Sequence, residues 1–148
     1  MLHNDWMRLA LKQAQLAFEQ GEVPIGAVIV HKGQVIASAY NEKEQTKDPT
    51  AHAEVLAIQR AAQVQGNWRL TGAILYVTLE PCSMCAGAII QARLKQVVYG
   101  CADLKGGATG SVMNVLDYTL WNHRVDVVAG VLEEECAEML KLFFRRLR

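Results

Sequence analysis

The chain has 148 residues, of which 51% are hydrophobic and 20% are charged, and its formal net charge is zero. This balance excludes disordered and fibrous classes and fits one globular domain that buries about two-thirds of its unfolded surface. No apolar run reaches the roughly 20 residues that span a bilayer, and the zero net charge gives no overall electrostatic signal for nucleic acid.

The cysteine content and the N-terminus indicate the compartment. Four cysteines, at positions 82, 85, 101 and 136, do not form the dense framework of a disulfide-stabilised protein. The N-terminal stretch is amphipathic and interrupted by charge, unlike a signal peptide. We therefore expect a reduced, cytoplasmic protein without a membrane partner.

Helical and extended patterns alternate in the first half of the chain. The expected elements are a helix over 4–20, a β-hairpin with strands 25–30 and 34–39, a polar loop over 41–50 and a helix over 51–64. Asn4 or Asp5 is expected to cap the first helix, because a side-chain oxygen can satisfy free amides at a helix start. Gly21 and Gly66 are expected to end the two helices, since glycine accepts left-handed geometry.

The second half continues this alternation. Its expected elements are a strand over 73–79, a helix over 83–93, a strand over 96–100, a glycine-rich loop over 101–114, a strand over 124–131 and a helix over 133–148. The uninterrupted apolar run AILYVTL predicts a strand that is buried on both faces. We expect residues 1–148 to form a single domain, an α/β sandwich with helices on both faces of one sheet.

Two cysteines begin one of these helices, in the stretch EPCSMCAG. The positive end of a helix dipole lowers the pKa of a cysteine and favours the metal-binding thiolate, which applies to Cys82 and Cys85. His52 begins another helix, and one imidazole with two thiolates is a ligand set suited to zinc. Three protein ligands with water in the fourth position is the arrangement of catalytic zinc. Glu54 points in a different direction around its helix from His52 and is expected to face that water.

Two other interpretations of the cysteine pair stay open. The pair also fits a redox dithiol in an intracellular α/β protein. A closed structural zinc site needs a fourth protein ligand, for which Cys101, His123 and Cys136 are the candidates. At position 101, where a strand ends, we expect a buried cysteine without a ligand role, and at position 136 a core residue.

The residues HAE and PCSMC resemble the H-x-E…P-C-x-x-C signature of the zinc-dependent nucleobase deaminases. Further segments, in order over nearly the whole chain, resemble the bacterial tRNA adenosine deaminase family. They are EVPIGAVIV, DPTAHAE, LYVTLEPCSMCAGAII, VVYG followed by D-x-K, the glycines up to GS, NHRV and the terminal FFR. The resemblance implies a three-layer α/β/α sandwich around one mixed five-stranded sheet, as in cytidine deaminase-like folds.

The same resemblance implies the reaction and the partners. The expected activity is hydrolytic deamination of the wobble adenosine in a tRNA anticodon loop to inosine, with one zinc per subunit held by His52, Cys82 and Cys85. Glu54 is expected to move protons to the base nitrogen and the departing amine, a role typically worth about 10²–10⁴-fold in rate. The expected partners are tRNA, through its anticodon stem-loop, and a second copy of the chain in a homodimer. No DNA partner is expected.

Substrate contacts outside the metal site are also implied by the resemblance. They are Asn41 on the target nucleotide, Asp103 near the ribose of a neighbouring nucleotide, Lys105, Arg124 and Arg145 on phosphates, and Phe144 stacked on a base. Phe143 and Phe144 cannot both face the core, because they are adjacent on one helix.

All of these contacts except Lys105 have a structural alternative. Asn41 can be a turn residue, Asp103 a loop cap, Arg124 a cap before the last strand and Phe144 part of a dimer interface. The basic C-terminus can be a solvated helix end whose cations complement the helix dipole. Its cations are Lys141, Arg145, Arg146 and Arg148.

Two rival functions fit part of the pattern. A deaminase of a free base or nucleotide, such as a guanine deaminase, shares the metal site but needs neither the D-x-K glycine loop nor the basic C-terminus. A zinc-stabilised binding module without catalysis needs a closed four-ligand site and leaves Glu54 without a role.

Overall fold

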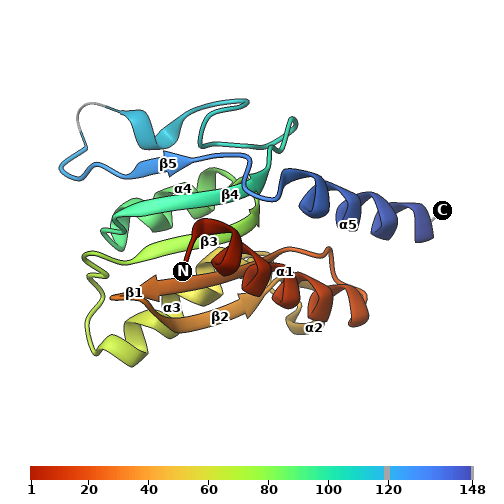
Figure 1. The fold of residues 1–148 in the computed structure, drawn as a ribbon, viewed down its shortest axis with the longest axis horizontal. Helices are drawn as coiled ribbons and strands as arrows, with labels where there is room; N and C mark the ends of the chain where they lie inside the picture. The colour runs from red at the N-terminus through yellow and green to blue at the C-terminus, as the bar shows by residue number, and fades with distance from the viewer. Residues whose placement is uncertain (119–120, 148) are drawn as a thin grey trace.

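The computed structural model describes residues 1–118 and 121–147. Its helices are α1 (His3–Glu19), α2 (Lys43–Thr46), α3 (Ala53–Gln65), α4 (Ser83–Gln91) and α5 (Glu133–Arg146), with a 3₁₀ turn at Val115–Asp117. Its strands are β1 (Gly26–His31), β2 (Gln34–Tyr40), β3 (Ile74–Leu79), β4 (Gln96–Cys101) and β5 (Asp126–Val128). The strands form one sheet in the order β2-β1-β3-β4-β5 (Figure 1).

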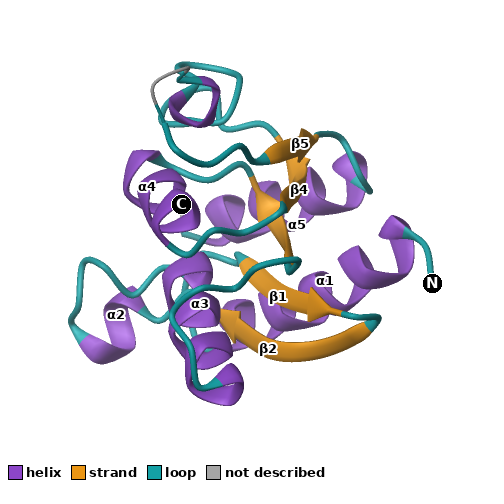
Figure 2. Cartoon of the chain, turned by 90° about the vertical axis from the view of Figure 1, so that its left-hand side faces the viewer, coloured by secondary structure: helices purple, strands orange, loops and turns teal. Residues whose placement is uncertain are grey.

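The sheet is mixed and lies between two helical layers. β1 pairs antiparallel with β2 and with β3, whereas β3, β4 and β5 run parallel. α1 and α5 cover one face of the sheet, and α3 and α4 cover the other (Figures 1 and 2). The expected three-layer sandwich with a mixed five-stranded sheet is confirmed.

An apolar core fills each face of the sheet. On β3, Leu75 and Val77 lie on the face of the sheet that α3 and α4 cover. Tyr76 lies on the opposite face, in the same core cluster as Trp6 and Met7 of α1. Because both faces of β3 are buried, its sequence is hydrophobic apart from Thr78, whose hydroxyl accepts the N–H of Gly26, and it does not alternate between polar and apolar residues. Polar chemistry is therefore left to the ends of the strands and to the loops that follow them.

The hairpin turn between β1 and β2 lies where the sequence predicted it. Lys32 and Gly33 both have positive φ angles, +51° and +74°. Two successive residues in this conformation match the right-handed twist of the flanking strands. The turn pairs His31 with Gln34, and a one-residue shift between Ile29 and Val30 then brings Gly26 opposite Tyr40, directly before Asn41.

Two predictions for the first half of the chain were wrong in detail. α1 begins at His3, so neither Asn4 nor Asp5 is its N-cap; the Asp5 carboxylate instead accepts the backbone N–H of Leu2 at 2.9 Å from within the first turn. The expected loop at 41–50 contains the short helix α2. No apolar periodicity marks four residues as a helix, so no sequence pattern predicts α2.

The end of the chain also differs from the expectation. β5 has three residues instead of the predicted 124–131, because it is an edge strand that pairs only with Gln96–Val98 of β4. Positive φ angles at Gly130 and Leu132 then turn the chain into α5. Arg148, counted in the basic C-terminus, lies outside the described residues. No helix in the described part of the chain is long and apolar enough to cross a membrane.

Gly26 opens β1 at a point where α1 lies directly against the strand. A Cβ at this position would collide with the backbone oxygen of Ala10, the backbone nitrogen of Ala14 and the Cβ of Gln13. Backbone atoms of a packed helix cannot move aside as a flexible side chain can. We expect Gly26→Ala to lower the free energy of unfolding by about 3 kcal/mol or more, measured by urea denaturation.

Gly87→Ala is the matched control for this substitution. Gly87 lies inside α4, and an added Cβ would meet no atom within 4 Å. Alanine is favoured over glycine in a helix interior by roughly 1 kcal/mol, so this variant should unfold at a higher urea concentration. Equal unfolding midpoints for Gly26→Ala and the unchanged protein would contradict the direct contact between α1 and β1.

Candidate metal centre and its surroundings

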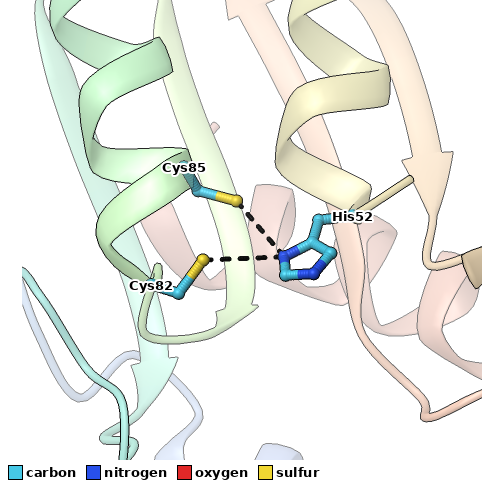
Figure 3. Close-up of side chains that lie close together, drawn as sticks. All are labelled: His52, Cys82 and Cys85. Carbon is cyan, nitrogen blue, oxygen red and sulfur yellow. Dashed lines mark hydrogen bonds between the residues drawn. The ribbon is translucent and has the colours of Figure 1, made fainter. Parts of the chain in front are cut away.

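His52, Cys82 and Cys85 meet at the starts of two helices on the same face of the sheet (Figure 3). His52 is the N-cap residue of α3, Cys82 is the N-cap residue of α4, and Cys85 lies in the first turn of α4. His52 Nδ1 is 3.6 Å from Cys82 Sγ and 3.5 Å from Cys85 Sγ. The three ligand atoms lie within 4.8 Å of one another, so the group can hold a metal ion.

The local backbone explains this convergence. β3 ends at Leu79, and three residues later the extended backbone of Cys82, with φ −78° and ψ 178°, starts α4. Helix starts carry partial positive charge, and the starts of α3 and α4 both point at the cluster. This charge favours the thiolate form of the cysteines, which is the form that binds metals.

The candidates for a fourth protein ligand are engaged elsewhere. The thiol of Cys101 donates to the carbonyl oxygen of Thr78. His123 Nε2 lies 2.6 Å from the carbonyl oxygen of Leu94. Cys136 is buried in the core between the sheet and α5. Within residues 1–118 and 121–147, His52, Cys82 and Cys85 are the one group of three or more such side chains with this spacing.

The two thiols of the metal-free site hold their protons unequally. A hydrogen bond with Cys85, helped by His52 and opposed by burial, lowers the pKa of Cys82 to about 4. The hydrogen bond to Cys82, together with burial, raises the pKa of Cys85, which keeps its proton. A metal ion must displace that proton, so metal affinity is expected to fall as the pH falls.

Glu54 is buried beside the cluster, with 4% of the residue exposed, in the first turn of α3. Burial raises its pKa to about 7; the Cys82 thiolate adds to the increase, whereas His52 and Cys85 oppose it. A carboxyl group with a pKa near neutrality can accept and donate a proton at the same pH. This is the property that general acid–base catalysis requires.

A pocket of 140 Å³ opens beside the metal cluster. It is lined by Val23, Ile25, Asn41, Lys43 and His52. Asn41 is buried; its Nδ2 donates to the carbonyl oxygen of Val23, and its Oδ1 accepts the N–H of Lys43. Asn41 is thus both a turn residue, as the alternative had it, and a wall of the pocket that contains His52.

The residues that shape this wall of the pocket were not predicted from the sequence. Glu22 has no exposed surface, and its carboxylate accepts the N–H groups of Glu44 and Gln45 in the first turn of α2, at 3.0 and 2.6 Å. α2 in turn carries Lys43 to the mouth of the pocket. The one sequence feature that pointed to this wall was a lysine, Lys43, two residues after the predicted substrate contact Asn41.

Asp103 and Lys105 lie together in the glycine-rich loop after β4. Asp103 Oδ1 accepts the N–H of Lys105 at 3.0 Å and of Gly106 at 3.2 Å, so this oxygen caps the loop. The N–H of Asp103 donates to the carboxylate of Glu80. Burial acts to raise the pKa of Glu80, but hydrogen bonds from Ser111, Asp103 and other loop amides outweigh it and lower the pKa. The sequence analysis gave Glu80 no role.

Of the six predicted substrate contacts, Asn41 alone lines the 140 Å³ pocket. Arg124 is exposed and lines a separate hollow of 240 Å³ next to β5. Phe144 is 47% exposed on α5, whereas Phe143 is buried, so only one of the two faces the core, as expected. Arg145 lies 3.8 Å from Glu138 in an exposed ion pair. It also lines a larger hollow of 690 Å³ between α1 and α5, which contains none of the cluster residues.

A three-layer fold with an imidazole and two cysteines at the starts of paired helices defines a metal-binding hydrolytic enzyme of the nucleobase deaminase type. A family model of the MafB19-like deaminases matches residues 1–148, and the chain belongs to this family. It is 54% identical to the tRNA-specific adenosine deaminase of Bacillus subtilis, over 97% of this chain and 89% of that protein. The resemblance drawn from the sequence is confirmed.

Two solved structures are similar to this fold. One, from a study of A-to-I editing by tRNA:A34 deaminases at the wobble position, has 47% sequence identity and a TM-score of 0.88, covering 91% of this chain and 98% of that chain. The other, the guanine deaminase of Bacillus subtilis, has 35% identity and a TM-score of 0.66, covering 81% and 87%.

Proposed function

We propose that this protein hydrolytically deaminates the wobble adenosine of a tRNA anticodon loop to inosine. The observation that carries the proposal is the convergence of His52, Cys82 and Cys85 beside the buried Glu54. This site lies in a chain that is 54% identical to a tRNA-specific adenosine deaminase over nearly its full length. We propose that residues 1–148 act as a single deaminase domain.

Zinc is the metal that this donor set fits, with one ion per subunit. One imidazole nitrogen and two thiolates are the ligands that zinc prefers over harder cations. A tetrahedral zinc with bonds of about 2.3 Å to sulfur and about 2.1 Å to nitrogen separates the two atoms by about 3.6 Å. The observed separations from His52 Nδ1 to Cys82 and Cys85 Sγ are 3.6 and 3.5 Å.

Glu54 is proposed to carry the protons of the reaction. When bound, zinc supplies a water molecule acidic enough to react near neutral pH. The Glu54 carboxylate would accept a proton from the attacking water and pass it to the ring nitrogen of the adenine as the water oxygen bonds to C6. It would then take the second proton from that oxygen and pass it to the amine, which leaves as ammonia when its bond to C6 breaks. Burial raises the pKa of this carboxyl group in the metal-free site, which favours a group that can both accept and donate a proton.

Asn41 is proposed to hold the target nucleotide in the pocket. Its side-chain amide retains one N–H beyond the bond to Val23 and a second lone pair beyond the bond from Lys43. The two internal bonds fix the orientation of the amide before substrate enters. A fixed donor and acceptor can then read a base edge or ribose with little further ordering cost.

The remaining contacts are proposed to bind the RNA outside the pocket. Asp103 Oδ1 is engaged within the loop, so Oδ2 is the proposed acceptor for a ribose 2′-hydroxyl, which DNA lacks. Lys105, Arg124 and Arg145 are proposed phosphate contacts, and the exposed Phe144 a stacking platform. A homodimer would bring two such surfaces together. We place the enzyme in the cytoplasm, with its tRNA substrate.

The rival functions have weaker support. The likeness to a guanine deaminase keeps a free-base substrate as the second candidate. A closed structural zinc site lacks a fourth protein ligand in the described part of the chain, because Cys101 and His123 are engaged with carbonyl oxygens of Thr78 and Leu94. It also leaves the buried carboxyl of Glu54 unexplained.

The test is to incubate zinc-loaded protein with an anticodon stem-loop RNA that carries adenosine at the wobble position. Inosine is measured by mass spectrometry of the digested RNA. The parallel reactions contain an RNA strand with guanosine at the wobble position, free adenine, free adenosine or free guanine. We expect inosine in the stem-loop alone. Ammonia released from free guanine, with no inosine in the RNA, would replace the proposal by guanine deamination on the same metal site.

A further inference from the structure

Glu80 stands between β3 and the cysteine pair, and only 2% of the residue is exposed. Its carboxylate accepts four hydrogen bonds from the glycine-rich loop. Oε1 accepts the N–H of Asp103 at 3.1 Å and the hydroxyl of Ser111 at 2.6 Å. Oε2 accepts the N–H groups of Thr109 and Ser111, each at 3.1 Å. Bonds to an ionised acceptor are roughly twice as strong as those between neutral groups.

The loop that supplies these donors has little regular structure of its own. Between β4 and the 3₁₀ turn, the described residues form a single isolated bridge, between Thr109 and Asn114. The N–H of Ala108 also donates to the carbonyl oxygen of Pro81, at 2.9 Å. The loop is therefore built on the Glu80–Pro81 dipeptide, which directly precedes the metal ligand Cys82.

Gly107 shows how closely the loop wraps the carboxylate. A Cβ at this position would collide with the carboxyl group of Glu80 and with the hydroxyl of Ser111. The N–H of Gly107 meanwhile donates to the carbonyl oxygen of Asp103 at 2.9 Å. The carboxylate thus fills the inside of the loop, where it binds the backbone N–H groups of Asp103, Thr109 and Ser111.

Asp103 connects this shape to the RNA contacts proposed above. Its N–H is bound by Glu80, and its own Oδ1 accepts the N–H of Lys105. The direction in which both side chains leave the loop therefore depends on the position of the Asp103 backbone. Glu80 itself is enclosed and cannot contact RNA.

We propose that Glu80 is a positioning residue for RNA binding, holding residues 103–111 in the shape that presents Asp103 and Lys105 to the substrate. This inference rests on the proposed function. Because Glu80 acts on the loop and not on the reacting base, its loss should weaken RNA binding far more than the chemical step. A purely structural carboxylate would instead affect overall stability without this selectivity.

The test variant is Glu80→Gln, which keeps the shape of the side chain. In either orientation, its NH₂ group faces donors that the carboxylate accepted, so some loop donors lose their partner. We expect one zinc per chain, amide hydrogen exchange at Asp103, Thr109 and Ser111 faster by about tenfold or more, and a KM for the stem-loop RNA raised by about tenfold or more. The kcat should stay within about threefold.

Glu22→Gln is the matched control, because it makes the same change at another buried carboxylate that accepts backbone amides. It should speed exchange at Glu44 and Gln45 and leave residues 103–111 protected. Asp103→Ala gives the second control: it should raise the KM in the unchanged protein but add little in the Glu80→Gln background. Should Glu80→Gln fail to fold, Ser111→Ala removes the hydroxyl's bond to Glu80 and its contact with the carbonyl oxygen of Asp103, and should raise the KM by about threefold.

An unchanged KM in Glu80→Gln, or loss of zinc, would overturn the positioning role while leaving the deaminase function of the unchanged protein standing. Multiplying effects of Glu80→Gln and Asp103→Ala would also overturn it, because the two residues would then act independently. If the protein without substitutions neither bound nor deaminated the stem-loop RNA, the proposed function would be wrong, and this inference would fall with it.

Discussion

Glu54→Gln should bind one zinc per chain and lose about 10²–10⁴-fold or more in the rate of inosine formation. Glutamine fills the same space but cannot take a proton from water, so the proton path proposed for the reaction is removed. Glu54 is not one of the three side chains in the metal cluster, so zinc should remain bound. Single-turnover deamination of the stem-loop RNA measures the rate, and elemental analysis of the purified variant measures the zinc.

Glu134→Gln provides the matched control, since it makes the same change at an exposed glutamate at the start of α5. It should leave the rate and the zinc content unchanged. If Glu54→Gln lost its zinc but kept its fold, the carboxyl would belong to the ligand set, and its role as a proton carrier would be wrong. Full activity of Glu54→Gln would equally remove Glu54 from the mechanism.

Cys85→Ala should abolish zinc binding and reduce deamination to background. Cys85 is fully buried, and its removal leaves His52 and Cys82 as a two-ligand site. Added zinc should also raise the melting temperature of the unchanged protein, because an ion at 100 times its Kd stabilises the folded state by about 2.7 kcal/mol. The variant should show no such rise. Differential scanning calorimetry with and without zinc measures the change in melting temperature of the unchanged protein and of the variant.

Cys101→Ala is the control that separates ligand cysteines from core cysteines. Cys101 is buried and donates to the carbonyl oxygen of Thr78 instead of facing the cluster. This variant should keep one zinc and the zinc-dependent rise in melting temperature, with a modest loss of stability from the small cavity. Loss of zinc from Cys101→Ala would show that the cluster of His52, Cys82 and Cys85 is not the complete ligand set.

The sandwich and the cluster of His52, Cys82 and Cys85 could be predicted from the sequence because their signals are local. Four of the five strands are runs of apolar residues bounded by glycine or polar residues, and such runs fold as strands wherever the sheet forms. The separation of Cys82 from Cys85 by two residues, at a helix start, already has the geometry of a shared metal. His52 and Glu54 likewise occupy neighbouring positions of one helix start.

Elements that depend on partners were harder to predict. β5 ends after three residues, because it pairs only with Gln96–Val98 of β4. The first turn of α2 donates its free backbone N–H groups to the carboxylate of Glu22. Glu22 lies 21 positions before the first residue of α2 in the chain. Neither pairing leaves a trace in the local pattern of polar and apolar residues.

By itself, the sequence determined the layered fold and the chemistry of the metal cluster, because periodicity and short spacings are properties of neighbouring residues. Only the tertiary structure decided that Cys101 stays outside the cluster, that Lys43 reaches the pocket beside Asn41, and that Glu80 holds the glycine-rich loop. A glutamate in a sequence is equally compatible with solvent and with burial. It becomes buried here because the fold brings four hydrogen-bond donors, from residues more than 20 positions away, to its two oxygens.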